Sequence, residues 1–66
     1  MRAFKKGDYV IVMKPVFVRK KDGRMISIQN RRFEVIGSIG CLTYCDIGCD
    51  KPVCIPTFYL MEPENF

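Results

Sequence analysis

Glycine and proline divide residues 33–59 into runs that are too short for helices. The runs between these breaks are rich in β-branched and aromatic residues. Such residues favour strands, and a run of four to eight of them bounded by turn residues is typical of a strand. The stretch therefore predicts a small β-meander, over which the rest of the chain closes. The breaks are Gly37, Gly40, Gly48, Pro52 and Pro56.

Length limits how the core can be built. The chain has 66 residues, and a domain of about this size buries only ~60% of its unfolded surface. Ordering costs ~1.5 kcal/mol per residue, so the core must be continuous. One all-β domain over residues 1–66, with strands wrapped around a single core, is the architecture that we expect.

Two further strand signals precede the meander. Residues 9–13 (Tyr-Val-Ile-Val-Met) form a β-branched run that ends at Lys14-Pro15, because proline removes a ladder donor and restricts the residue before it. Residues 16–28 are predicted to form a hairpin around Asp22-Gly23, a strong short hairpin signal. A two-residue loop and a longer loop with a glycine bulge both fit, so the register stays open.

Side-chain alternation predicts the faces of the meander. It places Ile39, Cys41, Thr43, Cys45 and Ile47 on one face, which is the candidate core face. Residues 56–59 are predicted to form a single 3₁₀ turn, and residues 60–62 a last edge strand. The predicted core comprises Val10, Val12, Phe33, Val35, Ile39, Cys41, Ile47 and Ile55.

Two short motifs carry a resemblance to a known fold. Residues 55–60, Ile-Pro-Thr-Phe-Tyr-Leu, resemble the Ile-Pro-Ser-Asn-Tyr-Val ending of SH3 domains. Lys6-Gly7-Asp8 before a strand is similar to the opening of KOW-type and other small bacterial or viral SH3-like modules. The resemblance implies a single SH3-like, five-stranded antiparallel barrel with a long basic hairpin loop after the first strand.

The chain also departs from signalling SH3 domains. Their Lys-Lys-Gly-Asp follows the long loop, whereas here it precedes that loop. The Ala-Leu-Tyr-Asp-Tyr opening and tryptophan are missing. Of the groove that binds proline-rich peptides in SH3 domains, only Tyr59 matches by position.

Charge is unevenly distributed along the chain. Residues 1–32 hold ten basic and two acidic residues, whereas residues 33–66 hold Lys51 against five acidic residues. Such asymmetry points to an acidic partner at the basic end, either nucleic acid or the acidic face of a protein. A solvated basic surface is the alternative.

The predicted hairpin carries the best functional signal. A basic β-ribbon can lie along phosphates and release their counterions. One hypothesis is a nucleic-acid or ribonucleoprotein accessory factor. The other is a small phage-type protein inhibitor or adaptor that docks on an acidic protein face or adds an edge strand. The candidate partner-binding residues are Phe17, Arg19, Lys20, Lys21, Arg24, Arg31 and Arg32.

The four cysteines have a C-x3-C-x3-C-x4-C spacing, which is unusual for zinc. On one strand Cys41 and Cys45 would lie ~13 Å apart, whereas thiolates sharing a zinc each approach it to about 2.3 Å. Reduced structural thiols are the favoured interpretation, and a metal site formed by Cys41, Cys45, Cys49 and Cys54 or a disulfide are the alternatives.

We expect no enzymatic activity and no cofactor. The chain lacks histidine, so a cysteine nucleophile has no usual base, and the acidic residues near the predicted turn have no third group to orient them. Neither a secretory signal nor a run long enough to span a bilayer is evident. The expected compartment is therefore the cytoplasm.

Overall fold

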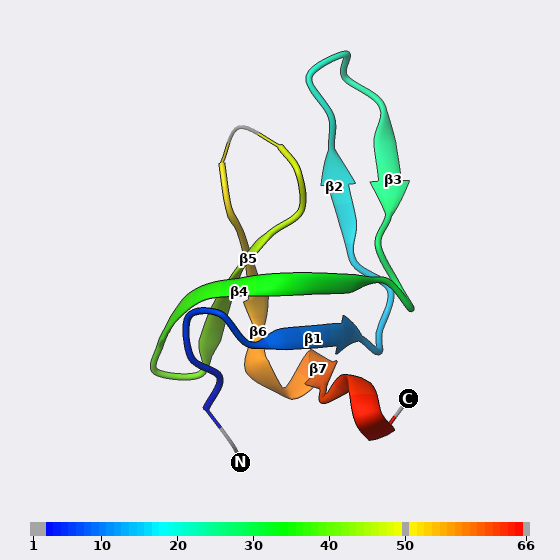
Figure 1. Ribbon diagram of the computed structural model, residues 1–66. Helices are drawn as coiled ribbons and strands as arrows, with labels where there is room; N and C mark the ends of the chain where they lie inside the picture. Colours follow the sequence, from blue (N-terminus) through cyan, green and yellow to red (C-terminus); the bar gives the residue numbers. More distant parts are fainter. Residues whose placement is uncertain (1–2, 50, 66) are drawn as a thin grey trace.

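The structure is a computed structural model that describes residues 3–49 and 51–65. Its described residues form β-strands and two single 3₁₀ turns (Figure 1). The strands are β1 (Tyr9–Val12), β2 (Phe17–Arg19), β3 (Met25–Ser27), β4 (Arg32–Ile39), β5 (Leu42–Asp46), β6 (Val53–Pro56) and β7 (Leu60–Met61). The 3₁₀ turns are η1 (Thr57–Tyr59) and η2 (Pro63–Asn65).

Five of these strands form one antiparallel sheet in the order β6-β5-β4-β1-β7. The β2–β3 hairpin forms a separate two-stranded sheet, and it projects from the main sheet beside the β5–β6 loop (Figure 1). The predicted 3₁₀ turn and last edge strand are confirmed by η1 and β7.

The all-β prediction is confirmed, but the two sheets do not close into a barrel. Within the described residues, β2 and β3 pair only with each other. The two residues of β7 pair with Ile11 and Val12 of β1, and no ladder joins β7 to β6 in the part of the chain that the structure describes. Both edges of the five-stranded sheet therefore remain open. Over the same residues, no helix is long and apolar enough to cross a membrane.

A single hydrophobic cluster holds the two sheets together. Of the predicted core residues, Val10, Val12, Val35 and Ile55 are fully buried, and Phe33 and Ile47 pack against them while half-buried. The hairpin region contributes Val18 and Ile28, so its base belongs to the core. The remaining buried members are Phe4, Cys45 and Leu60.

The core prediction was wrong for Ile39 and Cys41. Ile39 is 71% exposed, and Cys41 is also exposed. Alternation ends here because Gly40 and Cys41 form a two-residue turn, across which Ile39 pairs with Leu42. Gly40 has a φ of 59°, a left-handed conformation that glycine adopts without steric cost. Thr43 and Cys45, beyond the turn, do face the core as predicted.

A β-bulge explains the break that the sequence suggested at Gly37. Val35 pairs with Cys45 and Gly37 pairs with Tyr44, so Ile36 is the extra residue of β4. Glycine inside a strand often marks a bulge. The strand therefore continues to Ile39 instead of ending at Gly37.

Two buried threonines connect β5 to η1. The hydroxyls of Thr43 and Thr57 lie 2.8 Å apart in a buried hydrogen bond, and the Thr57 N–H donates to the carbonyl of Cys41 at 2.8 Å. The two side chains are 0% and 4% exposed. Burial of a hydroxyl is costly unless it is hydrogen-bonded, so the two threonines satisfy each other.

Candidate polyanion-binding site

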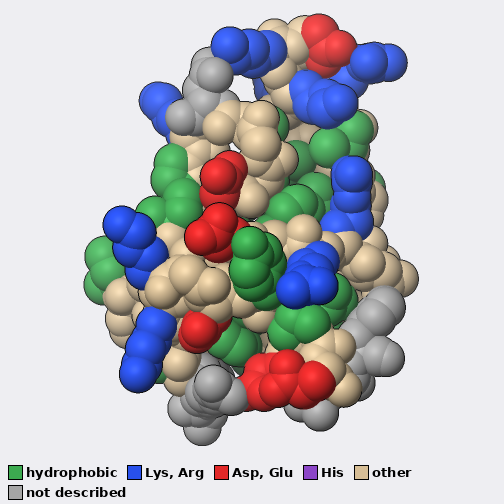
Figure 2. Space-filling view, in the orientation of Figure 1, with side chains coloured by type: hydrophobic (Ala, Val, Ile, Leu, Met, Phe, Trp, Pro, Cys, Tyr) green, Lys and Arg blue, Asp and Glu red, His purple; other side chains and the backbone are tan. Residues whose placement is uncertain are grey.

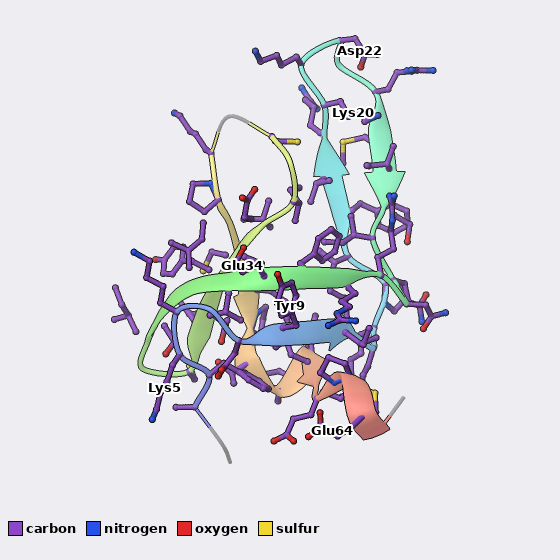
Figure 3. All side chains as sticks on the ribbon, viewed as in Figure 1. Lys5, Tyr9, Lys20, Asp22, Glu34 and Glu64 are labelled. Carbon is purple, nitrogen blue, oxygen red and sulfur yellow. The ribbon has the colours of Figure 1, made fainter. Side chains whose placement is uncertain are left out.

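The hairpin ends in a tight turn whose hydrogen bonds settle its register. The Gly23 N–H donates to the carbonyl of Lys20 at 2.9 Å, and the Lys20 N–H donates to the carbonyl of Arg24 at 2.8 Å. Gly23 has a φ of 89°. These features correspond to the longer loop with a glycine bulge. Lys20 and Asp22 thus lie at the free end of the hairpin (Figure 3).

Asp22, the one acidic residue of residues 16–28, is bound to Arg24. Its carboxylate accepts the Arg24 backbone N–H at 3.0 Å and the Arg24 Nε–H at 2.9 Å. These hydrogen bonds lower the pKa of Asp22, the backbone N–H having the larger effect. Residues 16–28 therefore carry four basic side chains against one carboxylate, and that carboxylate is bound to Arg24.

A groove separates the hairpin from the β5–β6 loop, and cationic residues line it from both sides. Its volume is about 510 Å³. Arg19, Lys20 and Lys21 line it from the hairpin, and Lys51 lines it from the loop. Lys51 is the one basic residue of residues 33–66. The fold therefore brings the single lysine of the acidic half of the chain to the basic hairpin. Figure 2 shows basic side chains gathered at this end of the molecule. We call this feature the hairpin–loop groove.

The rest of the groove is mostly aliphatic. Val18, Ile47, Pro52 and Val53 line it together with Cys49. Val18 is buried, Ile47 and Val53 are half-buried, and Pro52 and Cys49 are exposed. Where β5 ends and the β5–β6 loop begins, the Asp46 carboxylate accepts the Gly48 N–H at 2.9 Å and shapes the start of the loop. The groove therefore combines an apolar floor with a cationic border.

The outer face of the hairpin combines Arg19 with side chains that do not line the groove. Arg19 pairs with Met25 and Phe17 pairs with Ser27 across the ladder, so these four residues share a face. Phe17 is 63% exposed and Met25 is 54% exposed. This face places a cation beside two exposed apolar side chains, and Phe17 lies on it outside the groove.

The structure separates Arg31 and Arg32 from the groove. Arg31 lies between β3 and β4, where its carbonyl accepts the Val12 N–H at 3.1 Å. The Arg32 guanidinium lies over the ring of Tyr9, 4.7 Å from its centroid. Arg32 and Tyr9 line a separate hollow of about 330 Å³. Acidic residues also line this hollow, namely Asp8, Glu62 and Glu64.

The fold disperses the four cysteines, all of which are free thiols. Cys45 is buried in the core, whereas Cys41, Cys49 and Cys54 are exposed at a turn, in a loop and on β6. Burial raises the pKa of the Cys45 thiol to about 11, with a smaller contribution from Cys54. No group of three or more histidine, cysteine or acidic residues could hold a metal ion in the part of the chain that is described.

Sequence reasoning found the hairpin cations but missed two parts of the groove. Lys51 is the only basic residue of the acidic half of the sequence, and that position is the one signal in the sequence that points to it. The aliphatic floor was not foreseen. Asp50, one of the five acidic residues of residues 33–66, lies outside the described residues. No protein-family model matches the chain, and comparison with curated proteins and with solved structures gives no significant match.

Proposed function

We propose that this chain is a non-catalytic module that binds nucleic acid through the basic hairpin and Lys51. The observation that carries the proposal is the convergence of Arg19, Lys20 and Lys21 with Lys51 on one groove, from segments about 30 residues apart. The only acidic residue of the hairpin is bound to Arg24. Phosphates are the ligands that such a cationic border suits best.

The strand arrangement supports an SH3-like relationship for this module. A central β-meander follows a long hairpin, and a 3₁₀ turn precedes the last strand, in the order that the sequence resemblance implies. We propose that the fold is an open SH3-like variant in which the hairpin takes the place of the long loop. A binding role agrees with a chain that has no histidine to serve as the usual general base.

The salt dependence of binding tests the proposal. Each phosphate contact contributes a slope of about −0.7 to −0.9 in a plot of log affinity against log salt. We expect Lys51→Ala to reduce the slope by roughly one contact, as Lys20→Ala does. Lys5→Ala is the matched control. It removes the same charge as Lys51→Ala, and Lys5 is exposed far from the hairpin (Figure 3).

The result that contradicts the proposal is equally specific. If Lys5→Ala and Lys51→Ala changed affinity and slope equally, net charge and not the groove would account for binding. If the protein bound neither DNA nor RNA at low salt, the nucleic-acid function would be wrong.

The outer face of the hairpin favours a second candidate, an inhibitor or adaptor that docks on an acidic protein face. Arg19 lies opposite the exposed Met25, with Phe17 on the same face, and protein interfaces concentrate their energy in a few arginine and aromatic anchors. Alanine substitutions at Phe17 and Arg19 would then cause much larger losses than Lys20→Ala. Graded, similar losses across all cations would exclude this candidate.

A further inference from the structure

We infer that the hairpin–loop groove accepts one unpaired nucleobase, so that the protein prefers single-stranded nucleic acid to a duplex. This inference rests on the proposed nucleic-acid function and goes further, because it assigns a role to the apolar floor. Cations alone would attract the phosphates of either form. Only the floor distinguishes them.

The volume and the lining of the groove suit a ligand as small as a nucleobase. Its volume of about 510 Å³ falls within the ~300–1,000 Å³ typical of small-molecule sites. The aliphatic side chains of Ile47, Pro52 and Val53 offer a surface against which a base can remove its apolar faces from water. Lys20, Lys21 and Lys51 border that surface on both sides, where the phosphates flanking an extruded base would pass.

A duplex cannot use this floor at low cost. Its bases are stacked and paired, and extrusion of one base costs a few kcal/mol. An unpaired strand has no such pairing to break, and its bases can turn outward. A duplex would therefore contact the cationic border and leave the floor in water, whereas a single strand would cover both.

Base identity should matter little at this site. The described residues that line the groove offer aliphatic carbons, ammonium groups and the guanidinium of Arg19, and they include no amide side chain. Arg19 is thus the one described group of the lining that can make a bidentate contact with a base edge. Every base presents apolar faces, so contacts of this kind tolerate sequence. The inferred ligand class is single-stranded nucleic acid of mixed sequence.

Three oligonucleotides test the inference by fluorescence anisotropy at one salt concentration. They are a 12-nucleotide single strand, the blunt duplex of the same sequence, and the single strand with its central bases removed to leave abasic sites. We expect the intact strand to bind about tenfold tighter than either of the others. The salt slope of the abasic strand should match that of the intact strand, because its phosphates are unchanged.

Two variants locate the effect. Cys49 is exposed and lines the groove, so Cys49→Leu should occupy part of the floor and reduce the difference between intact and abasic strands to less than twofold. Cys41→Leu makes the same change at the exposed β4–β5 turn and should leave the tenfold difference intact.

The outcomes separate this inference from the proposed function. If intact strand, abasic strand and duplex bound equally and with a steep salt slope, the protein would bind phosphates and the groove would not accept a base. If none of the three bound but an acidic peptide did, both the nucleic-acid function and this inference would be wrong. If Cys49→Leu were unfolded, the abasic comparison with the wild-type protein would still decide.

Discussion

The buried hydroxyl pair of Thr43 and Thr57 allows a sharp test of the packing between β5 and η1. We consider replacement of each threonine by valine, which has nearly the same shape but no hydroxyl. Either single substitution leaves one hydroxyl buried without its partner, because the two hydroxyls are 2.8 Å apart and bond each other. A buried group left unpaired costs ~1–3 kcal/mol.

The double substitution should cost much less than the two single ones together. With both hydroxyls replaced, no polar group is left unpaired, and such paired replacements can be nearly neutral. If each single variant loses about 2 kcal/mol, the sum is about 4 kcal/mol, and we expect the double variant to lose about 1 kcal/mol or less. The predicted coupling energy is therefore about 3 kcal/mol.

Urea unfolding, followed by circular dichroism, measures the four free energies of unfolding at constant m value. Thr43→Ser is the control, since it keeps the hydroxyl and removes one methyl group, worth ~0.8 kcal/mol. If the losses of the single variants added in the double variant, the hydroxyls would not depend on each other and the described contact would be incorrect.

Two further predictions concern stability. Ile55→Val should lower the free energy of unfolding by ~0.5–1.5 kcal/mol because Ile55 is fully buried. Ile39→Val should change it by less than ~0.5 kcal/mol because Ile39 is exposed. Equal effects of the two substitutions in urea titrations would contradict the burial of Ile55 and the exposure of Ile39. Cys45 has a pKa of about 11 in the fold against 9.0 ordinarily, so the unfolded chain loses this proton first as pH rises. The free energy of unfolding of the wild-type protein should therefore fall between about pH 9 and pH 11, by ~2 kcal/mol more than that of Cys45→Ala. Parallel pH profiles for the two proteins would count against a buried thiol.

Local signals in the sequence predicted local structure well. The Asp22-Gly23 pair indicated the hairpin, and the run after Pro56 indicated a 3₁₀ turn and an edge strand, because each depends on a few adjacent residues. The alternation rule failed at Ile39 and Cys41, since it assumes a continuous strand and a two-residue turn at Gly40 interrupts it. Glycine at that position was compatible with either a bend or a turn.

The candidate site was harder to predict because it depends on contacts between distant segments. The cations of the hairpin are consecutive, so the sequence revealed them. Lys51 reaches the same groove only because the β5–β6 loop lies beside the hairpin, and no local pattern encodes that neighbour. Arg32 was grouped with the hairpin by sequence proximity, yet the ladder between β1 and β4 places it against Tyr9.

The way in which the hairpin is attached has a consequence for how this protein can change. Val18 and Ile28 fix its base in the core, whereas residues 19–25 are all exposed. Substitutions, and even insertions, at the tip can therefore alter affinity for a partner while the fold persists. Such an arrangement lets natural variation or a protein engineer exchange the recognition loop as a unit, with residues 16–18 and 26–28 retained as the graft points.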